Sequence, residues 1–276
     1  MLQGDFAKGH GLGNDYVVLE EERLGFPLTP ERVRLLCHRH LGLGSDGILA
    51  LSRQGDRFRV RIWNPDGSEA ERSGNGLRIA AKFLSDHGYT KERIFPIGTA
   101  AGPVTTEVYR RDGRVHAVRL EMGRAVVDET IRKLSVEGAE VDVTVVSVGN
   151  PHCVIFGEPL TRERLFAIGP QVERHARFPD RINVQLVVPE TRARIKALVW
   201  ERGAGHTLAS GTSACAVAAA CVARGLVDGT VTVSMEGGEL DVAVAPDRSI
   251  VMKGPVEEVY VGTLSPDLRR QLLECP

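Results

Sequence analysis

The chain carries one sequence plan twice, and this duplication limits the folds open to it more than any other feature. Residues 73–76 read SGNG and residues 210–213 read SGTS, so a serine precedes a glycine at two positions 137 residues apart. The flanking matches are Trp63 with Trp200, Gly88 with Gly225, and Gly13-Asn14 with Gly149-Asn150. Two similar halves, each with a polar residue at a Gly-rich helix start, predict one site formed between facing halves. Two reactive groups on opposite sides of a ligand suit proton transfer at a stereocentre.

Length and composition indicate a soluble protein of two domains. The 276 residues could form one large or two ordinary domains, and the duplication favours two. Hydrophobic content of 42% and charged content of 26% are typical of globular proteins. No low-complexity linker stands out, so symmetry places the boundary near residue 117. We expect an N-terminal half at 1–117, a C-terminal half at 118–256, and a return of 257–276 to the first half.

Charge and cysteine usage exclude several functional classes. The net charge of −1 provides no basic field, so we expect neither nucleic acid nor an anionic membrane as a partner. Residues 1–8 lack the apolar region of a signal peptide, and the small apolar run at 214–223 is about half the length needed to span a bilayer. The five cysteines are odd in number and form no C-x-x-C pair. These features favour a cytoplasmic protein with no zinc site and no disulfide framework.

Hydrophobic spacing and turn residues predict a fold with many strands and few helices. Thr29-Pro30 is typical of a helix start, and the apolar spacing that follows predicts a helix ending at Gly42. Further helices are expected from Gly74 to about Asp86 and from Gly211 to about Arg224. Alternating apolar residues predict strands near 58–62, 118–122, 141–145, 195–199, 231–233, 240–244 and 250–252. This pattern indicates the α+β class with mainly antiparallel sheets.

Both serines stand where a helix is expected to begin, and two interpretations of them remain open. The amides of the first helical turn have no partner within the helix, so two such helix starts could bind one carboxylate. Serine is also a preferred N-cap, whose hydroxyl accepts a hydrogen bond from a first-turn amide. Capping alone needs no other group nearby.

Five motifs in order resemble the diaminopimelate epimerase family. They are HGLGND at 10–15, GSDG at 44–47, NPDGSEAE at 64–71, GNPH at 149–152 and ERGAG at 201–205. The resemblance runs from residue 8 to about residue 225. It implies two pseudo-symmetric domains, each a barrel-like sheet wrapped around a central helix. It further implies a homodimer without pyridoxal phosphate, metal or other cofactor, and interconversion of LL- and meso-diaminopimelate, a precursor of lysine and peptidoglycan.

The same resemblance assigns roles to individual residues. It places the two catalytic acid/base positions at Ser73 and Ser210, with His152 and Glu201 beside them to activate the serines. The backbone amides that would bind the α-carboxylate belong to Gly74, Asn75, Gly211 and Thr212. The remaining substrate-binding residues that it implies are Asn14, Asn64, Asn150, Asn183, Glu201 and Arg202. Arg202 has physical support, because a guanidinium binds a carboxylate through two hydrogen bonds, although a surface salt bridge is an alternative for it.

The two catalytic positions depart from the family pattern. The family motifs C-G-N-G and A-C-G-T correspond to residues 73–76 and 209–212, where this chain has serine in place of both cysteines. A serine hydroxyl is a poor base unless a neighbour takes its proton. His206 also replaces a glutamate of the motif, either as another base, as a change of specificity, or as a solvated loop residue. Cys153 and Cys215 lie near the motifs, and we expect both to be small core residues.

Three interpretations therefore remain at the level of sequence. The chain is an epimerase of diaminopimelate, or a related racemase or lyase acting on another amino acid, or a catalytically silent amino-acid-binding homologue. The last includes a chain whose two cysteines were deliberately replaced.

Overall fold

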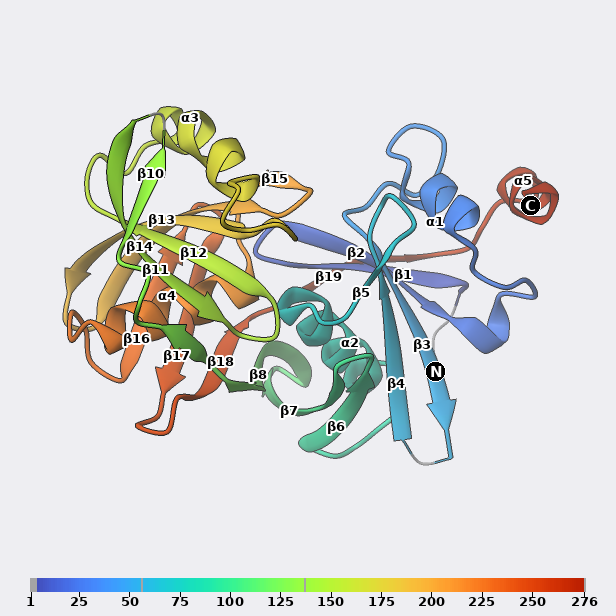
Figure 1. Ribbon diagram of the computed structural model, residues 1–276. Helices are drawn as coiled ribbons and strands as arrows, with labels where there is room; N and C mark the ends of the chain where they lie inside the picture. Colours follow the sequence, from blue (N-terminus) through green and yellow to red (C-terminus); the bar gives the residue numbers. More distant parts are fainter. Residues whose placement is uncertain (1–3, 56, 137, 276) are drawn as a thin grey trace. The chain divides into compact units, whose positions relative to one another are not determined.

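The computed structural model describes residues 4–55, 57–136 and 138–275, and it divides into two compact units (Figure 1). Unit 1 comprises Met1–Leu120 and Pro255–Pro276, and unit 2 comprises Glu121–Gly254. The last segment of the chain thus belongs to the same unit as the first.

Unit 1 contains a sheet, a 3₁₀ turn, two short α-helices and one long α-helix. Its strands are β1 (Phe6–Gly11), β2 (Asn14–Glu20), β3 (Ile48–Gln54), β4 (Arg57–Trp63), β5 (Glu69–Ala70), β6 (Ile94–Thr99), β7 (Gly102–Arg111), most of β8 (Arg114–Arg124) and β19 (Glu257–Gly262). Its helices are the 3₁₀ turn η1 (Glu21–Arg23), α1 (Pro30–Cys37), α2 (Gly74–Asp86) and α5 (Pro266–Glu274). The hydrogen-bonded order is β19-β1-β2-β3-β4-β6-β7-β8, in which only the β2–β3 and β4–β6 pairs are parallel.

Unit 2 repeats this order of paired strands and adds β10, an antiparallel partner of β11. Its strands are β9 (Val126–Asp128), β10 (Lys133–Val136), β11 (Ala139–Ser147), β12 (Pro151–Phe156), β13 (Asn183–Thr191), β14 (Arg194–Glu201), β15 (Gly205–Thr207), β16 (Thr230–Met235), β17 (Gly238–Val244) and β18 (Ser249–Pro255). Its helices are α3 (Arg162–Glu173) and α4 (Gly211–Ala223). The order is β9-β11-β12-β13-β14-β16-β17-β18, and again only the pairs β12–β13 and β14–β16 are parallel.

The repeated topology shows that the duplication seen in the sequence is a duplication of the fold. In each unit a short strand, β5 or β15, pairs with the strand that precedes the long helix. That short strand turns the chain back so that the serine follows directly at the helix start. The mainly antiparallel sheets with interspersed helices confirm the α+β class.

Each long helix forms the core of its own unit. Every residue of α2 from Gly74 to Ser85 is buried, and so is every residue of α4 from Gly211 to Cys221. Helix α2 contacts β1, β2, β3, β7 and β19, while α4 contacts β9, β11 to β14, β16 and β17. A helix buried on all sides needs apolar surroundings on all sides, and here the curved sheet provides them. This confirms the barrel-like wrap around a central helix.

The expected end of the first helix is wrong, although its start is confirmed. Thr29 caps α1 by accepting a hydrogen bond from the Arg32 amide at 3.3 Å, but the helix ends at Cys37 rather than at Gly42. The loop that follows folds back over the helix end, and the amides of Leu43 and Gly44 donate to the Leu36 carbonyl. These bonds satisfy the terminal carbonyls earlier than the apolar spacing suggests.

Candidate functional site

In unit 1, Ser73 lies at the N-cap of α2. Its hydroxyl accepts a hydrogen bond from the Gly76 amide at 3.0 Å, so the capping interpretation is correct for this residue. The hydroxyl also lies 3.3 Å from the Tyr16 hydroxyl, which β2 positions. The glycine at position 76 lets the first turn of α2 pack closely against Leu49, because a Cβ at this position would lie 2.9 Å from the Leu49 side chain. The first-turn amides of Gly74 and Asn75 have no acceptor within the helix, as in any helix start.

The asparagines predicted for unit 1 fall into two separate places. Asn14 and Asn75 lie together, and Asn75 Nδ2 donates to Asn14 Oδ1 at 3.0 Å. Asn64 instead lies in the turn after β4, where its Nδ2 donates to Ser68 Oγ at 3.0 Å. Asn64 is therefore bonded within its own turn, whereas Asn14 and Asn75 are bonded to each other.

In unit 2, Ser210 lies at the N-cap of α4 and has a carboxylate beside it. Its hydroxyl donates to Glu201 Oε2 at 3.1 Å and accepts from the Ser213 amide at 3.4 Å. Thr212 Oγ1 lies 3.4 Å from the same hydroxyl. Ser210 is thus both a cap and a hydroxyl whose proton points at a possible base.

His152 lies in the interior of unit 2 and is bonded at both ring nitrogens. Gln185 Nε2 donates to His152 Nδ1 at 3.0 Å, so the other nitrogen, Nε2, carries the proton and donates to Asn150 Oδ1 at 2.9 Å. Burial lowers the pKa of His152 from 6.5 to about 3. The imidazole is therefore neutral near pH 7, and neither nitrogen is available to Ser210. Within this unit the hydroxyl of Ser210 donates to Glu201, and not to His152.

Hydrogen bonds fix the loop that carries Glu201 and Arg202, and they also fix Asn183. Asn183 Nδ2 donates to the Pro151 carbonyl at 2.9 Å, and Asn183 Oδ1 accepts from the Arg202 amide at 2.9 Å. The Arg202 side chain is exposed, with its guanidinium donating to the Asp180 carbonyl at 3.3 Å. The buried carboxylate of Glu173 accepts from Trp200 Nε1 at 2.8 Å and from the Gly203 amide at 3.0 Å. The loop that carries Glu201 is thereby held from both ends.

His206 forms an ion-pair cluster rather than contacting Ser210. Its Nε2 lies 2.6 Å from Glu236 Oε2, and Arg162 Nε donates to Glu236 Oε1 at 2.5 Å. Burial alone would raise the pKa of Glu236, but the bonds from His206 and Arg162 outweigh it and lower that pKa. His206 also packs against the ring of Phe166 at a centroid distance of 5.4 Å. This pairing clamps β15 to the turn after β16.

Sequence reasoning missed three residues that organise these sites. They are Tyr16 beside Ser73, Gln185 between His152 and Ser213, and Glu173 beneath the loop of Glu201. Gln185 alone left a signal, because it is a polar residue in the apolar run of β13 and is fully buried. Cys153 and Cys215 are fully buried, which confirms that they are core residues.

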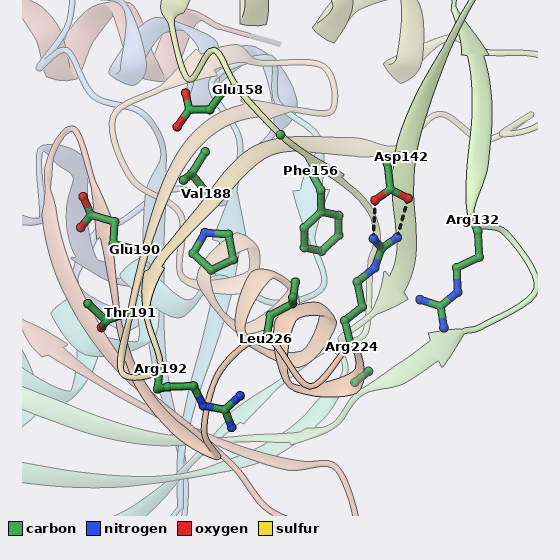
Figure 2. A pocket seen from close by; sticks show the side chains of 13 residues that line it. Arg132, Asp142, Phe156, Glu158, Val188, Glu190, Thr191, Arg192, Arg224 and Leu226 are labelled. Carbon is green, nitrogen blue, oxygen red and sulfur yellow. Dashed lines mark hydrogen bonds and ion pairs between the residues drawn. The ribbon is translucent and has the colours of Figure 1, made fainter.

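The cavity drawn in Figure 2 is remote from Ser210 along α4. It has a volume of about 920 Å³ and lies at the C-terminal end of α4, whereas Ser210 is at the N-terminal end. Arg224 crosses it, bound to both Asp142 oxygens at 2.5 and 3.0 Å and stacked on Phe156 at 4.0 Å. Because Arg224 is engaged by these partners, we assign the cavity no role in the candidate site.

The described residues contain neither a candidate metal centre nor a candidate membrane-spanning helix. No group of three or more His, Cys, Asp and Glu side chains there could hold a metal ion. No helix among them is both long enough and apolar enough to cross a membrane.

Comparisons with known proteins identify close relatives in sequence. The family model described as diaminopimelate epimerase matches residues 6–127 and 144–259. The chain is 40% identical to diaminopimelate epimerase 2 of Nostoc sp. strain PCC 7120 over 279 aligned residues, covering 95% of this chain and 96% of the relative. It is 38% identical to the diaminopimelate epimerase of Desulfitobacterium hafniense, covering 95% and 99%.

Solved structures of more distant proteins share the fold. A hydroxyproline epimerase from Agrobacterium vitis matches with a TM-score of 0.69 at 17% identity, covering 95% of this chain and 92% of that one. A PhzF-family phenazine biosynthesis protein from Bacillus anthracis matches with a TM-score of 0.69 at 14% identity, covering 93% and 98%.

Proposed function

Because the chain belongs to the diaminopimelate epimerase family, we propose that it binds diaminopimelate and interconverts the LL and meso forms. The reaction is a two-base proton transfer, with the groups at positions 73 and 210 acting on one α-carbon. One group removes the α-proton, and the other returns a proton to the opposite face of the planar carbanion. One proton leaves the α-carbon and one proton returns to it, so substrate and product have the same atoms and charge and the reaction consumes no cofactor.

The observation that carries this proposal is the bond from Ser210 to Glu201. A hydroxyl at 3.1 Å from a carboxylate has the acceptor it needs to lose or regain a proton. The amides of Gly211 and Thr212, with those of Gly74 and Asn75, are donors for the α-carboxylate, and they also stabilise the negative charge that develops on it. Asn64, Asn150, Asn183 and Arg202 remain the residues proposed to bind the distal end of the substrate.

Serine in place of cysteine predicts a slow enzyme. A thiol ionises near pH 8.5, and a helix N-terminus lowers that value, whereas a serine hydroxyl does not ionise in this range. Matched acid/base groups contribute about 10²- to 10⁴-fold to a proton transfer. We therefore expect turnover well below that of a chain with thiols at both positions.

The test is deuterium entry at the α-carbon of LL-diaminopimelate in D₂O, followed by NMR or mass spectrometry. We expect slow exchange, and an increase of about 100-fold or more in the double variant Ser73→Cys/Ser210→Cys. The matched control is Ser265→Cys, which makes the same change at the N-cap of α5 and should leave the rate unchanged. A double variant that folds and still fails to exchange would contradict the proposal.

A second candidate is amino-acid binding without turnover, and the hydroxyls at both positions favour it. Calorimetric titration with diaminopimelate separates the two. Tight binding by the parent chain, with no exchange over long incubation, would establish the binding function. Exchange with another amino acid alone would instead indicate a related racemase or lyase, an interpretation motivated by the loss of both thiols and by His206 in place of the glutamate of the motif.

The wider setting is also a proposal. We infer a cofactor-independent homodimer that works in the cytoplasm and supplies a precursor of lysine. Five free thiols are compatible with a reducing compartment. Size-exclusion chromatography with light scattering tests the dimer, because a monomeric mass at micromolar concentration would exclude it.

A further inference from the structure

Four side chains of unit 1 form a directed chain of hydrogen bonds that ends beside the start of α2. Arg78 Nη2 donates to Asn75 Oδ1 at 2.8 Å, and Asn75 Nδ2 donates to Asn14 Oδ1 at 3.0 Å. Asn14 Nδ2 then donates to Asp46 Oδ2 at 3.0 Å. The chain joins α2, the β1–β2 hairpin and the loop before β3, which are far apart in sequence.

The charges at the two ends fix the direction of every bond. A guanidinium can only donate, and an ionised carboxylate can only accept. The oxygen of the Asn75 amide must therefore face Arg78, and the oxygen of the Asn14 amide must face Asn75. Oriented bonds of this kind polarise one another along a chain. Neither amide can rotate by half a turn without placing two donors or two acceptors together.

Asp46 is itself held in place by several groups. Its Oδ2 also accepts from the Asp15 amide at 3.1 Å, and its Oδ1 accepts from Arg39 at 2.7 Å. Its own amide donates to the Asp15 carbonyl at 2.9 Å. Lys8 lies 2.7 Å from the neighbouring Asp15 carboxylate. The carboxylate that terminates the chain is thus fixed in both position and orientation.

We propose that Asp46 is the positioning residue for the substrate-binding amides of unit 1, acting through Asn14 on Asn75. Asn14 uses one Nδ2 hydrogen on Asp46 and one oxygen lone pair on Asn75. The chain therefore holds its second N–H and its second lone pair in a fixed orientation. Those two groups suit the carboxylate and the ammonium of an α-amino acid. This inference rests on the proposed function for its ligand, but not for the chain itself.

The decisive variant is Asp46→Asn, which keeps the size of the side chain and removes one acceptor. If the new amide turns its oxygen toward Asn14, its NH₂ group meets Arg39, which is also a donor. If it turns the oxygen toward Arg39, its NH₂ group meets Asn14 Nδ2 and the Asp15 amide. Each orientation places donors against donors, so the direction of the chain is no longer fixed.

The first measurement needs no ligand. In protein labelled with ¹⁵N at asparagine side chains, the Asn14 and Asn75 amide signals, assigned by single replacements, should shift in Asp46→Asn. Their hydrogen exchange should become about ten-fold faster or more, in line with the loss of a charge-assisted bond. Asn183 in unit 2 is the internal control and should not change. Signals of Asn14 and Asn75 that superimpose on those of the parent would overturn the proposal.

The second measurement uses ligand and a rescue. Calorimetric titration should show diaminopimelate binding to Asp46→Asn about 10- to 100-fold more weakly than to the parent. Adding Arg39→Gln should restore most of the affinity and the original signals, because glutamine can accept from the new amide while that amide's oxygen faces Asn14. Arg39→Gln alone should weaken binding less than Asp46→Asn does, since the Arg39 side chain is 57% exposed and the glutamine amide can still donate to Asp46.

The outcomes separate this inference from the proposed function. If the parent chain does not bind diaminopimelate, the proposed function fails, while the NMR test of the chain still stands. If the parent binds and Asp46→Asn binds equally well, the positioning role fails and the proposed function survives. A general loss of structure would appear as a lower melting temperature that Arg39→Gln does not restore, and would also count against the proposal.

Discussion

The hydroxyl of Ser210 donates to the carboxylate of Glu201 across 3.1 Å, whereas the hydroxyl of Ser73 lies 3.3 Å from the phenol of Tyr16. The two units repeat one topology and yet surround their serines with different chemistry. A carboxylate favours the protonated form of its neighbour, while a neutral phenol can donate to a deprotonated one. We propose that the two positions serve opposite halves of a proton transfer.

Removal of the Glu201 carboxylate should abolish this difference. We expect Glu201→Gln to lower the rate of α-deuterium exchange by about 100-fold, because the Ser210 hydroxyl loses the acceptor of its proton. Binding of diaminopimelate should weaken less than the rate falls. Glu239→Gln, which changes a half-exposed carboxylate paired with Arg194, is the control and should exchange at the parent rate. Equal exchange rates for Glu201→Gln and the parent would show that Glu201 is not the acceptor.

Thiols placed at the two positions should ionise differently. In Ser73→Cys the thiol lies at the start of α2, where the helix lowers its pKa, and the side-chain hydroxyl bonded at this position is the phenol of Tyr16. In Ser210→Cys the start of α4 has the same lowering effect, but burial and the neighbouring Glu201 carboxylate both raise the pKa of the thiol. We expect the pH midpoint of alkylation, measured by peptide mass spectrometry, to be at least about one unit lower for Ser73→Cys. Ser265→Cys provides the reference thiol at an exposed N-cap, and a reversed order of midpoints would refute the assignment of roles.

The parts of the fold that were predictable from sequence are those set by local signals. Helices α2 and α4 begin where Ser-Gly signals place them, because a cap and its amides are close in the chain. Helices α3 and α5 were missed, although Thr161 and Ser265 cap them in the same way. Helix α3 buries four residues and α5 buries one, so few apolar positions mark either helix in the sequence.

The sequence predicts which residues belong to the candidate sites, but it does not predict which of them contact one another. Tyr16 reaches Ser73 from 57 positions away, and only the pairing of β1, β2 and β3 brings it there. By sequence alone His152 and Glu201 are equivalent candidates to activate a serine, because the sequence does not reveal that Gln185 donates a hydrogen bond to the imidazole of His152. Long-range register decides which polar groups meet, and a single sequence contains little information about it.

The burial of His152 should make the protein less stable in mild acid. Its pKa is lowered from 6.5 to about 3 by burial, so the unfolded chain binds a proton that the folded chain refuses. The free energy of unfolding should therefore fall by about 2 kcal/mol between pH 7 and pH 5 from this residue alone. Urea unfolding at the two pH values measures the loss, and His152→Gln should lack this contribution. The control His40→Gln, at an exposed position, should show the same loss of stability as the parent. If the free energy of unfolding falls equally between pH 7 and pH 5 in the parent and in His152→Gln, the burial argument is contradicted.

The native cysteines should be unable to replace the missing thiols, and their reactivity tests this. Burial raises the pKa of Cys153 and of Cys221 to about 12 and also raises that of Cys37, while Cys215 has no exposed surface. Only Cys275, in the last turn after α5, is partly exposed. We expect iodoacetamide at pH 8 to add one label to the native protein, at Cys275, and five labels after unfolding. Fast labelling of Cys153 or Cys215 in the native state, suppressed by diaminopimelate, would instead place a reactive thiol at the substrate. The exchange reaction would then no longer depend on the two serines.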